Sequence, residues 1–186
     1  MKMTREQALD YVRPALKTPR YEHTVRVVDQ AVELAKRFGA DSKKAELAAA
    51  FHDYAKCMPL NLLKRWIEKD RRLPKDLLDY HHELWHGPVG ALMLEQEIRL
   101  EDADILSAIS SHTTGKKHMS ILDKVVFLAD YIEPCRGFLG VEEVRALAET
   151  DLDHACTLAL KNTIVFLVGK GRTVYPDTFH AYNDLI

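Results

Sequence analysis

Apolar residues in this chain recur mainly three and four positions apart, the spacing that places them on one face of an α-helix. Val25, Val28 and Val32 follow this spacing. They predict a helix over about residues 21–38, and Gly39 is the residue expected to end it. No stretch shows the sustained alternation of apolar and polar residues that a half-buried strand requires. The pattern therefore predicts an all-α fold.

Capping residues and prolines set the limits of the other predicted helices. Thr4 and Gln7 form a capping-box pattern that begins the first helix, which Pro14 interrupts. Asp41 or Ser42 begins a third helix, which is apolar on every side near its end, as buried helices are. We expect Pro59 to end this third helix, Ser120 with Asp123 to begin a helix that Pro134 ends, and further helices over 62–69, 87–96, 104–111, 144–150 and 151–168. After Gly169 the tail is rich in turn residues and predicts no clear element.

Length and composition describe an ordinary folded protein. A chain of 186 residues corresponds to one domain with a sizeable core. Hydrophobic residues make up 47% of it, and 8 glycines and 7 prolines are too few for a fibrous or low-complexity protein. No apolar run approaches the ~18 residues of a membrane span, and the start of the chain lacks the apolar core of a signal peptide. We therefore expect no membrane partner.

Charge and cysteine content limit which partners and which cellular compartment we expect for this protein. The chain has 26 Lys and Arg against 28 Asp and Glu, a net charge of −2, which gives no long-range attraction for nucleic acid. Cys57, Cys135 and Cys156 are widely spaced and form no C-x-x-C pair. Free thiols are typical of a reducing compartment, so we expect a cytoplasmic protein without a disulfide framework or a cysteine-based zinc site.

The histidines carry the chemistry of this sequence, and there are nine of them. His52 and Asp53 stand at the end of the apolar run AELAAAF, where both side chains would be costly to bury without partners. A hydrogen-bonded structural pair would satisfy this pattern as well as a pair of metal ligands would. The dipeptide alone leaves both interpretations open.

Four more residues favour the metal interpretation. His23 lies near the start of a predicted helix, His86 begins another, and His112 follows the end of a third. Asp130 lies inside the apolar face of the helix that Ser120 begins. Helices that converge on one point would bring all six nitrogen and oxygen donors together, which is more than one tetrahedral zinc ion accepts. Six donors suit two octahedral ions with one bridging carboxylate.

The order H…HD…H…H…D resembles the HD-domain metal-dependent phosphohydrolases. The strings RYEHT, FHDYAK, HGPVGA, SSHTTG and LADYIEPCRG are similar to those of the YqeK family, the HD-type symmetrical diadenosine tetraphosphatases of bacteria. This resemblance covers nearly the whole chain. It implies a single-domain helical bundle over 1–186, with a binuclear metal site between helices. The ligands fall within about 18–136, and 137–186 supplies C-terminal helices and the tail.

The resemblance also implies how the metals are held. In this family pattern one ion takes His23, His52 and Asp130, the other takes His86 and His112, and Asp53 bridges them. Iron is the metal that the family suggests. Imidazole and carboxylate donors equally suit Mn, Co or Zn, so the residues themselves do not choose among these metals.

Cationic and hydroxyl side chains near the six ligands are candidates for phosphate binding. Lys56 is three residues past Asp53, so on a continuous helix it would share the face of Asp53 and point its ammonium group at the metals. Each of the others also has an ordinary interpretation as a solvated or capping side chain. These further candidates are Arg20, Arg26, Thr113, Thr114 and Arg136.

The remaining histidines predict no second site. Glu83 and His86 match half of a ferritin-like di-iron motif, but we find no second Glu-x-x-His in the sequence, so we set that class aside. His118, His154 and His180 are expected at the surface.

The expected reaction is hydrolysis of a phosphoanhydride, in which a metal-bridging hydroxide attacks phosphorus, with Asp53 and Lys56 as the catalytic residues. The resemblance implies that diadenosine tetraphosphate is cut symmetrically into two ADP. Two alternatives stay open, namely another HD phosphohydrolase acting on mononucleotides or cyclic dinucleotides, and a non-catalytic metal-dependent nucleotide sensor. The expected partner is a small nucleotide, and a homodimer is kept open as the assembly.

Overall fold

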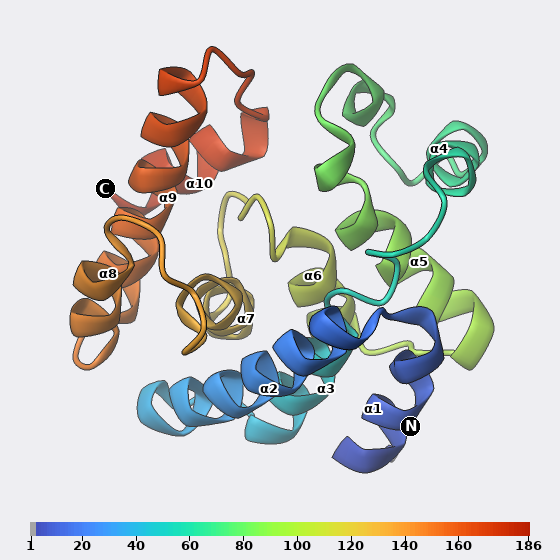
Figure 1. Ribbon diagram of the computed structural model, residues 1–186, viewed down its shortest axis with the longest axis horizontal. Coiled ribbons are helices and arrows are strands. Elements are labelled where there is room, and N and C mark those ends of the chain that lie inside the picture. Colours follow the sequence, from blue (N-terminus) through green and yellow to red (C-terminus); the bar gives the residue numbers. More distant parts are fainter. Residues whose placement is uncertain (1–2) are drawn as a thin grey trace.

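The computed structural model describes residues 3–186, and over that range the chain forms ten α-helices, three short 3-10 helices and no strand (Figure 1). The all-α prediction is therefore confirmed. The helices of the first half are α1 (Arg5–Val12), α2 (Thr18–Phe38), α3 (Ser42–Phe51), α4 (Leu60–Lys69) and α5 (His86–Ile98). Those of the second half are α6 (Ala103–Ser111), α7 (Ile121–Ile132), α8 (Val141–Ala148), α9 (Leu152–Gly169) and α10 (Pro176–Leu185). The 3-10 helices are η1 (Arg13–Ala15), η2 (Lys75–Asp79) and η3 (His82–Leu84).

Local sequence signals fix the ends of several helices, as predicted. Thr4 makes the capping box that begins α1, and Ser120 makes the one that begins α7. The Asp41 carboxylate accepts backbone N–H bonds at the start of α3, which settles the choice between Asp41 and Ser42. Gly39 ends α2 with φ 76°, a left-handed conformation that costs little without a Cβ.

Three predicted boundaries are wrong, and one helix was not predicted. Helix α8 runs over Val141–Ala148 rather than 144–150. The third helix ends at Phe51 rather than at Pro59, because the backbone from 52 to 58 continues as tight turns with bonds between residues three apart, such as Lys56 N–H to the Asp53 carbonyl. Helix α2 begins three residues earlier than expected, with Pro19 in its first turn. The tail is not irregular, because it forms α10, which packs against α9.

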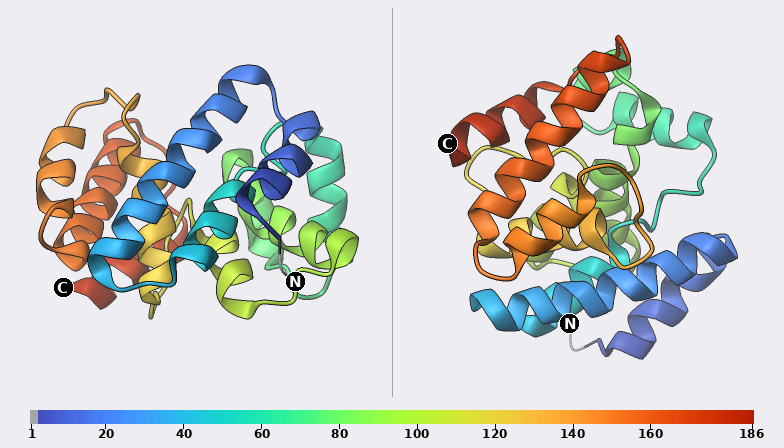
Figure 2. Two further views of the ribbon diagram at one scale, coloured as in Figure 1. Left: turned by 90° about the horizontal axis from the view of Figure 1, so that it is seen from below. Right: turned by 60° about the vertical axis from the view of Figure 1, so that its left-hand side comes forward.

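The helices pack around a core that α7 crosses. Helix α2 packs against α3 and α7, α6 packs against both α5 and α7, and α9 packs against α7 (Figure 2). In Figure 1, α8 to α10 lie on one side of α7, while α4 and α5 lie on the other. The fully buried Leu34, Phe51, Leu94, Ile109 and Leu128 join α2, α3, α5, α6 and α7 in one core. The inner ends of these five helices therefore meet near the middle of the molecule.

The structure also bears on the predictions about membrane spans and cysteines. No helix in the described range is long and apolar enough to cross a membrane. Cys57, Cys135 and Cys156 are all free thiols.

Candidate metal centre

The six predicted ligands lie together where the central helices meet. Helix α2 carries His23, and α7 carries Asp130. Directly after the last turn of α3 come His52 and Asp53. His86 is the first residue of α5, and His112 directly follows α6. The four histidines and Asp53 are buried, and Asp130 is partly exposed, so the cluster has one side open to solvent.

The ligand atoms form two groups that overlap at His52. Ligand atoms of His23, His52 and Asp130 lie within 4.8 Å of one another, and Nε2 of His23 is 3.0 Å from Oδ1 of Asp130. His52, Asp53 and His112 form a second group within the same limit. His86 joins this second group, since its Nε2 is 3.1 Å from Nε2 of His112.

Asp53 faces both groups, one with each carboxylate oxygen. Its Oδ2 lies 3.2 Å from Nε2 of His52 and 3.7 Å from Nε2 of His23. Its Oδ1 lies 3.1 Å from Nε2 of His86 and 3.9 Å from Nε2 of His112. This position supports the interpretation of Asp53 as the shared ligand.

The outer nitrogen of each histidine is held by an oxygen. Nδ1 donates to the Ala49 carbonyl in His52, to the Glu83 carbonyl in His86 and to the Ile109 carbonyl in His112, over 2.6, 2.7 and 2.7 Å. A carbonyl oxygen only accepts, so the proton must be on Nδ1. In a neutral ring Nε2 then carries a lone pair aimed at the centre, which is how metal-bound histidines are oriented.

Two of the inward nitrogen atoms lack hydrogen-bond partners. Within residues 3–186, Nε2 of His23 and of His52 is buried and makes no hydrogen bond, although each lies near a carboxylate oxygen. Buried polar atoms are nearly always paired, so two unpaired nitrogens at one point require an explanation. A cation placed among these lone pairs and carboxylates satisfies all of them at once. The residues present therefore fit a metal centre with nitrogen and oxygen ligands.

Protonation at the centre agrees with this chemistry. Burial opposes ionisation of Asp53, but the imidazoles of His52 and His86 hold its pKa well below the usual value. Burial, together with the positive charges of His52 and His86, lowers the pKa of His112 to about 3. Burial also disfavours a charged His52, yet the Asp53 carboxylate raises its pKa. The centre thus favours a positive charge beside the carboxylates of Asp53 and Asp130.

Glu133 is part of the site and was missed from the sequence. Its Oε1 accepts from Nδ1 of His23 over 3.1 Å, and its Oε2 accepts from Nε of Arg26 over 2.7 Å. Burial raises the pKa of Glu133, but Arg26 and the backbone N–H of Cys135 outweigh this and lower it to about 2. Glu133 is ionised and orients His23. The one available signal was its place three residues after Asp130, on the same helical face.

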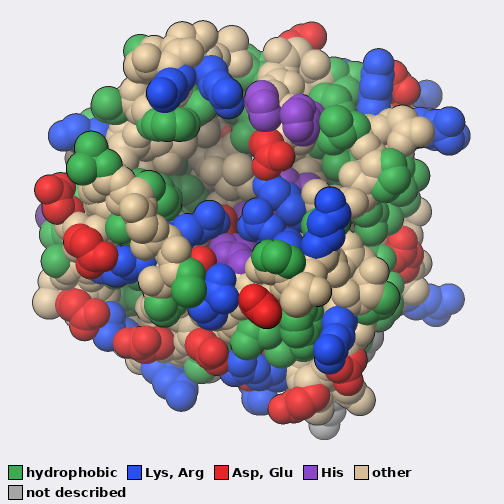
Figure 3. Space-filling view, viewed as in Figure 1, with side chains coloured by type: hydrophobic (Ala, Val, Ile, Leu, Met, Phe, Trp, Pro, Cys, Tyr) green, Lys and Arg blue, Asp and Glu red, His purple; other side chains and the backbone are tan. Residues whose placement is uncertain are grey.

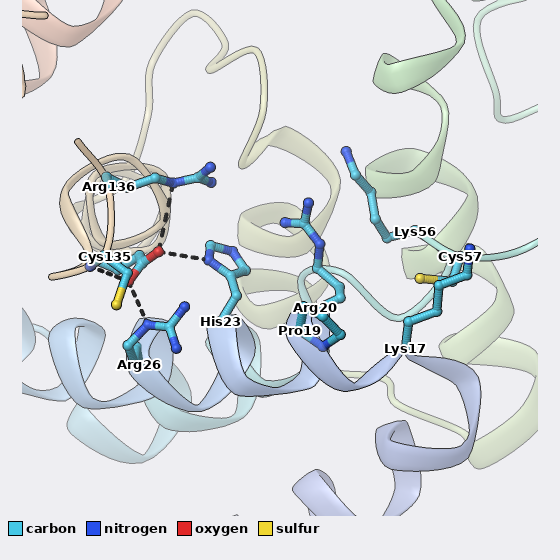
Figure 4. A pocket seen from close by; sticks show the side chains of 10 residues that line it. Lys17, Pro19, Arg20, His23, Arg26, Lys56, Cys57, Cys135 and Arg136 are labelled. Carbon is cyan, nitrogen blue, oxygen red and sulfur yellow. Dashed lines mark hydrogen bonds and ion pairs between the residues drawn. The ribbon is translucent and has the colours of Figure 1, made fainter. Parts of the chain in front are cut away.

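A cationic pocket of about 490 Å³ opens beside His23 (Figure 4). Figure 4 shows His23 with Arg26 and Arg136 on one side and with Arg20 and Lys56 on the other. These four cations were predicted, whereas Lys17, which also lines the pocket, was not. The positive charge lies where a phosphate chain next to the cluster would need it.

Each predicted cation is paired with a carboxylate of the cluster or its rim. Arg20 donates to Oδ2 of Asp53 over 2.9 Å, and Arg136 donates to Oδ1 of Asp130 over 2.6 Å. Lys56 was expected to point at the metals from a continuous helix. Because the helix ends at Phe51, Lys56 instead forms an ion pair with Glu83 at the rim. Its substrate role stays a prediction.

The two threonines differ in what they offer. Thr113 Oγ1 lies 3.1 Å from Nε2 of His112, so this hydroxyl reaches the cluster. Thr114 is buried, and its hydroxyl donates to the Gly115 carbonyl over 2.8 Å. The geometry therefore supports substrate contact by Thr113 more than by Thr114. His118, His154 and His180 are at the surface, as expected.

Comparison with known proteins identifies the class of this fold and site. The HD domain model matches residues 20–135, a range that contains all six candidate ligands. The chain belongs to the HD domain family.

Full-length relatives narrow the comparison. A Bacillus subtilis protein named symmetrical bis(5'-nucleosyl)-tetraphosphatase is 54% identical over 99% of this chain and 98% of its own. A Halalkalibacterium halodurans protein of the same name is 50% identical over the same shares. A crystal structure from Clostridium acetobutylicum, described as a "predicted HD superfamily hydrolase involved in NAD metabolism", has a TM-score of 0.90 at 36% identity, covering 98% of this chain and 97% of that one.

Proposed function

We propose that this protein is a metal-dependent hydrolase of phosphoanhydride bonds that cleaves diadenosine tetraphosphate symmetrically into two ADP. The observation that carries the proposal is the convergence of four imidazole Nε2 atoms and two carboxylates at the edge of a pocket lined by five cations. A cluster of this kind suits hydrolysis of a polyanion. The substrate and the position of cleavage follow the names of the full-length relatives.

The proposed centre holds two divalent or mixed-valence ions. His23, His52 and Asp130 would hold one ion, and His86 and His112 would hold the other. Asp53 turns one carboxylate oxygen toward each group and would be the shared ligand. Two such ions lower the pKa of water and offset charge on the phosphoryl oxygens. Iron is our first choice, and the same donors accept Mn, Co or Zn.

The other residues have proposed roles in holding and orienting. Glu133 fixes the ring of His23, and Arg20 fixes the carboxylate of Asp53. Arg26, Lys56 and Arg136 line the pocket and would bind phosphate oxygens by charge-assisted hydrogen bonds. Thr113 and Thr114 complete the proposed substrate contacts, with Thr113 the nearer to the cluster.

We also propose that residues 1–186 act as one domain, in which about 18–136 hold the metals and 137–186 flank them. The proposed setting is the cytoplasm, without nucleic-acid or membrane partners. The homodimer stays a prediction, and light scattering on the metal-loaded protein checks it.

The proposed reaction is tested by its products. The protein is loaded in turn with Fe²⁺, Mn²⁺, Co²⁺ or Zn²⁺ and incubated with diadenosine tetraphosphate in oxygen-18 water. Chromatography and mass spectrometry should show ADP alone, with one label in each pair of ADP molecules. ATP with AMP would contradict symmetrical cleavage. Intact substrate with every metal would favour the nucleotide sensor, and faster turnover of a mononucleotide or cyclic dinucleotide would favour the other alternative.

A further inference from the structure

A second cavity, of about 570 Å³, lies next to the metal centre, between η3 and the turn that joins α9 to α10. Figure 3 shows a hollow on this face, with Lys, Arg and His side chains gathered along its lower side. The residues of its wall that matter here are Leu84, Thr113, Phe166, Leu167, Arg172 and Tyr175. We call this space the nucleoside cavity.

The nucleoside cavity borders the cluster of proposed ligands. Thr113 lines the cavity, and its Oγ1 lies 3.1 Å from Nε2 of the proposed ligand His112. Glu83 also lines the cavity and forms an ion pair with Lys56, which lines the cationic pocket. The proposed metal ligands and the Lys56–Glu83 pair therefore lie between the two spaces. A phosphate chain that crosses the cluster has the cationic pocket at one end and this cavity at the other.

The two spaces differ in chemistry. Five cations line the pocket beside His23, which suits phosphate groups. The nucleoside cavity is instead lined by two leucines and two aromatic side chains, together with threonines, His81, Glu83 and a single arginine, Arg172. Apolar and aromatic walls with a few polar groups are typical of sites for planar organic groups.

Phe166 is the main reason to expect that this cavity binds a nucleotide base. This residue lies on α9, lines the cavity and is 58% exposed, so its ring is accessible to a ligand. Tyr175 on the opposite side of the α9–α10 turn is buried and held by an edge contact with Tyr80, with ring centroids 5.0 Å apart. Aromatic side chains bind bases by stacking, whatever the base.

We propose that this cavity binds one adenosine of the dinucleotide, with its base stacked on Phe166, while the phosphates extend across the cluster into the cationic pocket. The proposal rests on the function proposed above and adds where one end of the substrate lies. The hydroxyls of Thr163 and Thr173 also line the cavity and are available to the ribose or the base edge.

Steady-state kinetics of the metal-loaded, full-length protein test the proposal. Phe166→Ala should raise KM for diadenosine tetraphosphate by roughly 5- to 150-fold, the effect of losing one stacked base, with kcat changed little. Phe166→Tyr should keep KM near the wild-type value. The matched control is Phe179→Ala, which removes a comparably exposed phenylalanine of α10 that does not line the cavity. An unchanged KM in Phe166→Ala would overturn the proposal.

Inorganic tripolyphosphate separates a stacking role from general damage, because it has no base. Its inhibition constant should be the same in Phe166→Ala and in the wild type. A parallel rise in both constants would mean that the substitution disturbs the cluster, and the nucleoside assignment would fall. If the wild type does not hydrolyse diadenosine tetraphosphate, the calorimetric Kd replaces KM. Weaker binding by Phe166→Ala would then support the cavity although the proposed reaction fails, and an equal Kd would overturn it.

Discussion

Short contacts fix the orientation of individual side chains at the centre. Asp53 has the most contacts, since it faces four imidazoles and accepts from Arg20 while almost completely buried. An ionised carboxylate in that position is stable only if positive charge surrounds it. The consequences of removing it should therefore exceed those of removing an outer partner.

Asp53→Ala should abolish hydrolysis and lower metal content, because it removes the carboxylate that faces both ligand groups. The loss should be greater than the roughly 10- to 100-fold that an outer-sphere partner is worth. Metal analysis and turnover are measured on the same sample. Asp53→Asn keeps the shape without the charge and should be milder. Normal turnover with both ions retained in Asp53→Ala would show that the bridging assignment is wrong.

Lys56→Ala should lower kcat/KM by roughly 10- to 150-fold, the worth of a charge-assisted contact of about 1.5–3 kcal/mol. Metal content should not change, and His118→Ala serves as the surface control.

Glu83→Gln should act in the opposite direction to Lys56→Ala, because it frees the Lys56 ammonium for the substrate. An exposed pair contributes up to about 1 kcal/mol, so KM should fall by up to about 5-fold. Loss of metal in Lys56→Ala would instead assign Lys56 to the support of the ligands.

At the scale of elements, the close approach of α5 to the end of α6 brings His86 and His112 together. Gly87 makes this approach possible, since a Cβ there would lie 2.9 Å from the Ser110 carbonyl oxygen and 3.4 Å from Cε1 of His112. Backbone atoms cannot move aside as a flexible side chain does. The distance between α5 and α6, and with it the second ligand group, therefore depends on the absence of a Cβ at Gly87.

Gly87→Ala should lower both stability and metal content, because α5 must move away from α6. Overpacking costs about 1–3 kcal/mol, which corresponds to a decrease in Tm of roughly 2–12 °C for a chain of this size. Calorimetry and metal analysis provide the two measurements. Gly90→Ala is the matched control on the same helix, because its Cβ would meet Ala55 at an ordinary 3.4 Å. Equal effects of the two substitutions would refute the role of Gly87.

Sequence reasoning predicted most of the helices and six candidate ligands that the structure brings together, but it missed parts that depend on packing. The six candidate ligands stood out because polar residues interrupted apolar patterns or stood at helix ends. Glu133 gave no such signal, since a glutamate at a helix end is ordinarily solvated. The end of α3 was missed because the sequence after Phe51 still favours a helix. On a continuous α-helix, however, the neighbours His52 and Asp53 would point about 100° apart. The tight turns after Phe51 allow both His52 and Asp53 to face the centre. Helix α10 has few buried residues and forms against α9.

For the whole molecule, the centre lies where five helices meet, so the bound ions should contribute to the stability of the entire fold. Without them, unpaired nitrogens and carboxylates remain buried together. Each ion at 100 times its Kd adds about 2.7 kcal/mol. Removal of metal by a chelator should therefore lower Tm by roughly 5–10 °C per ion. Calorimetry before and after Fe²⁺ or Mn²⁺ is restored measures the shift, and an unchanged Tm would contradict ligation by these residues.

The outer hydrogen bonds of the histidines have a consequence for how the centre assembles. His52, His86 and His112 each bond a carbonyl only three residues back, so a single turn of chain is enough to aim the ring. His23 instead relies on Glu133, which lies at the far end of the HD region. We therefore expect three rings to be oriented as soon as their own turns form during folding, and the fourth only after α2 and α7 have docked. The ion that we propose for His86 and His112 should thus be captured first on folding and released last on unfolding.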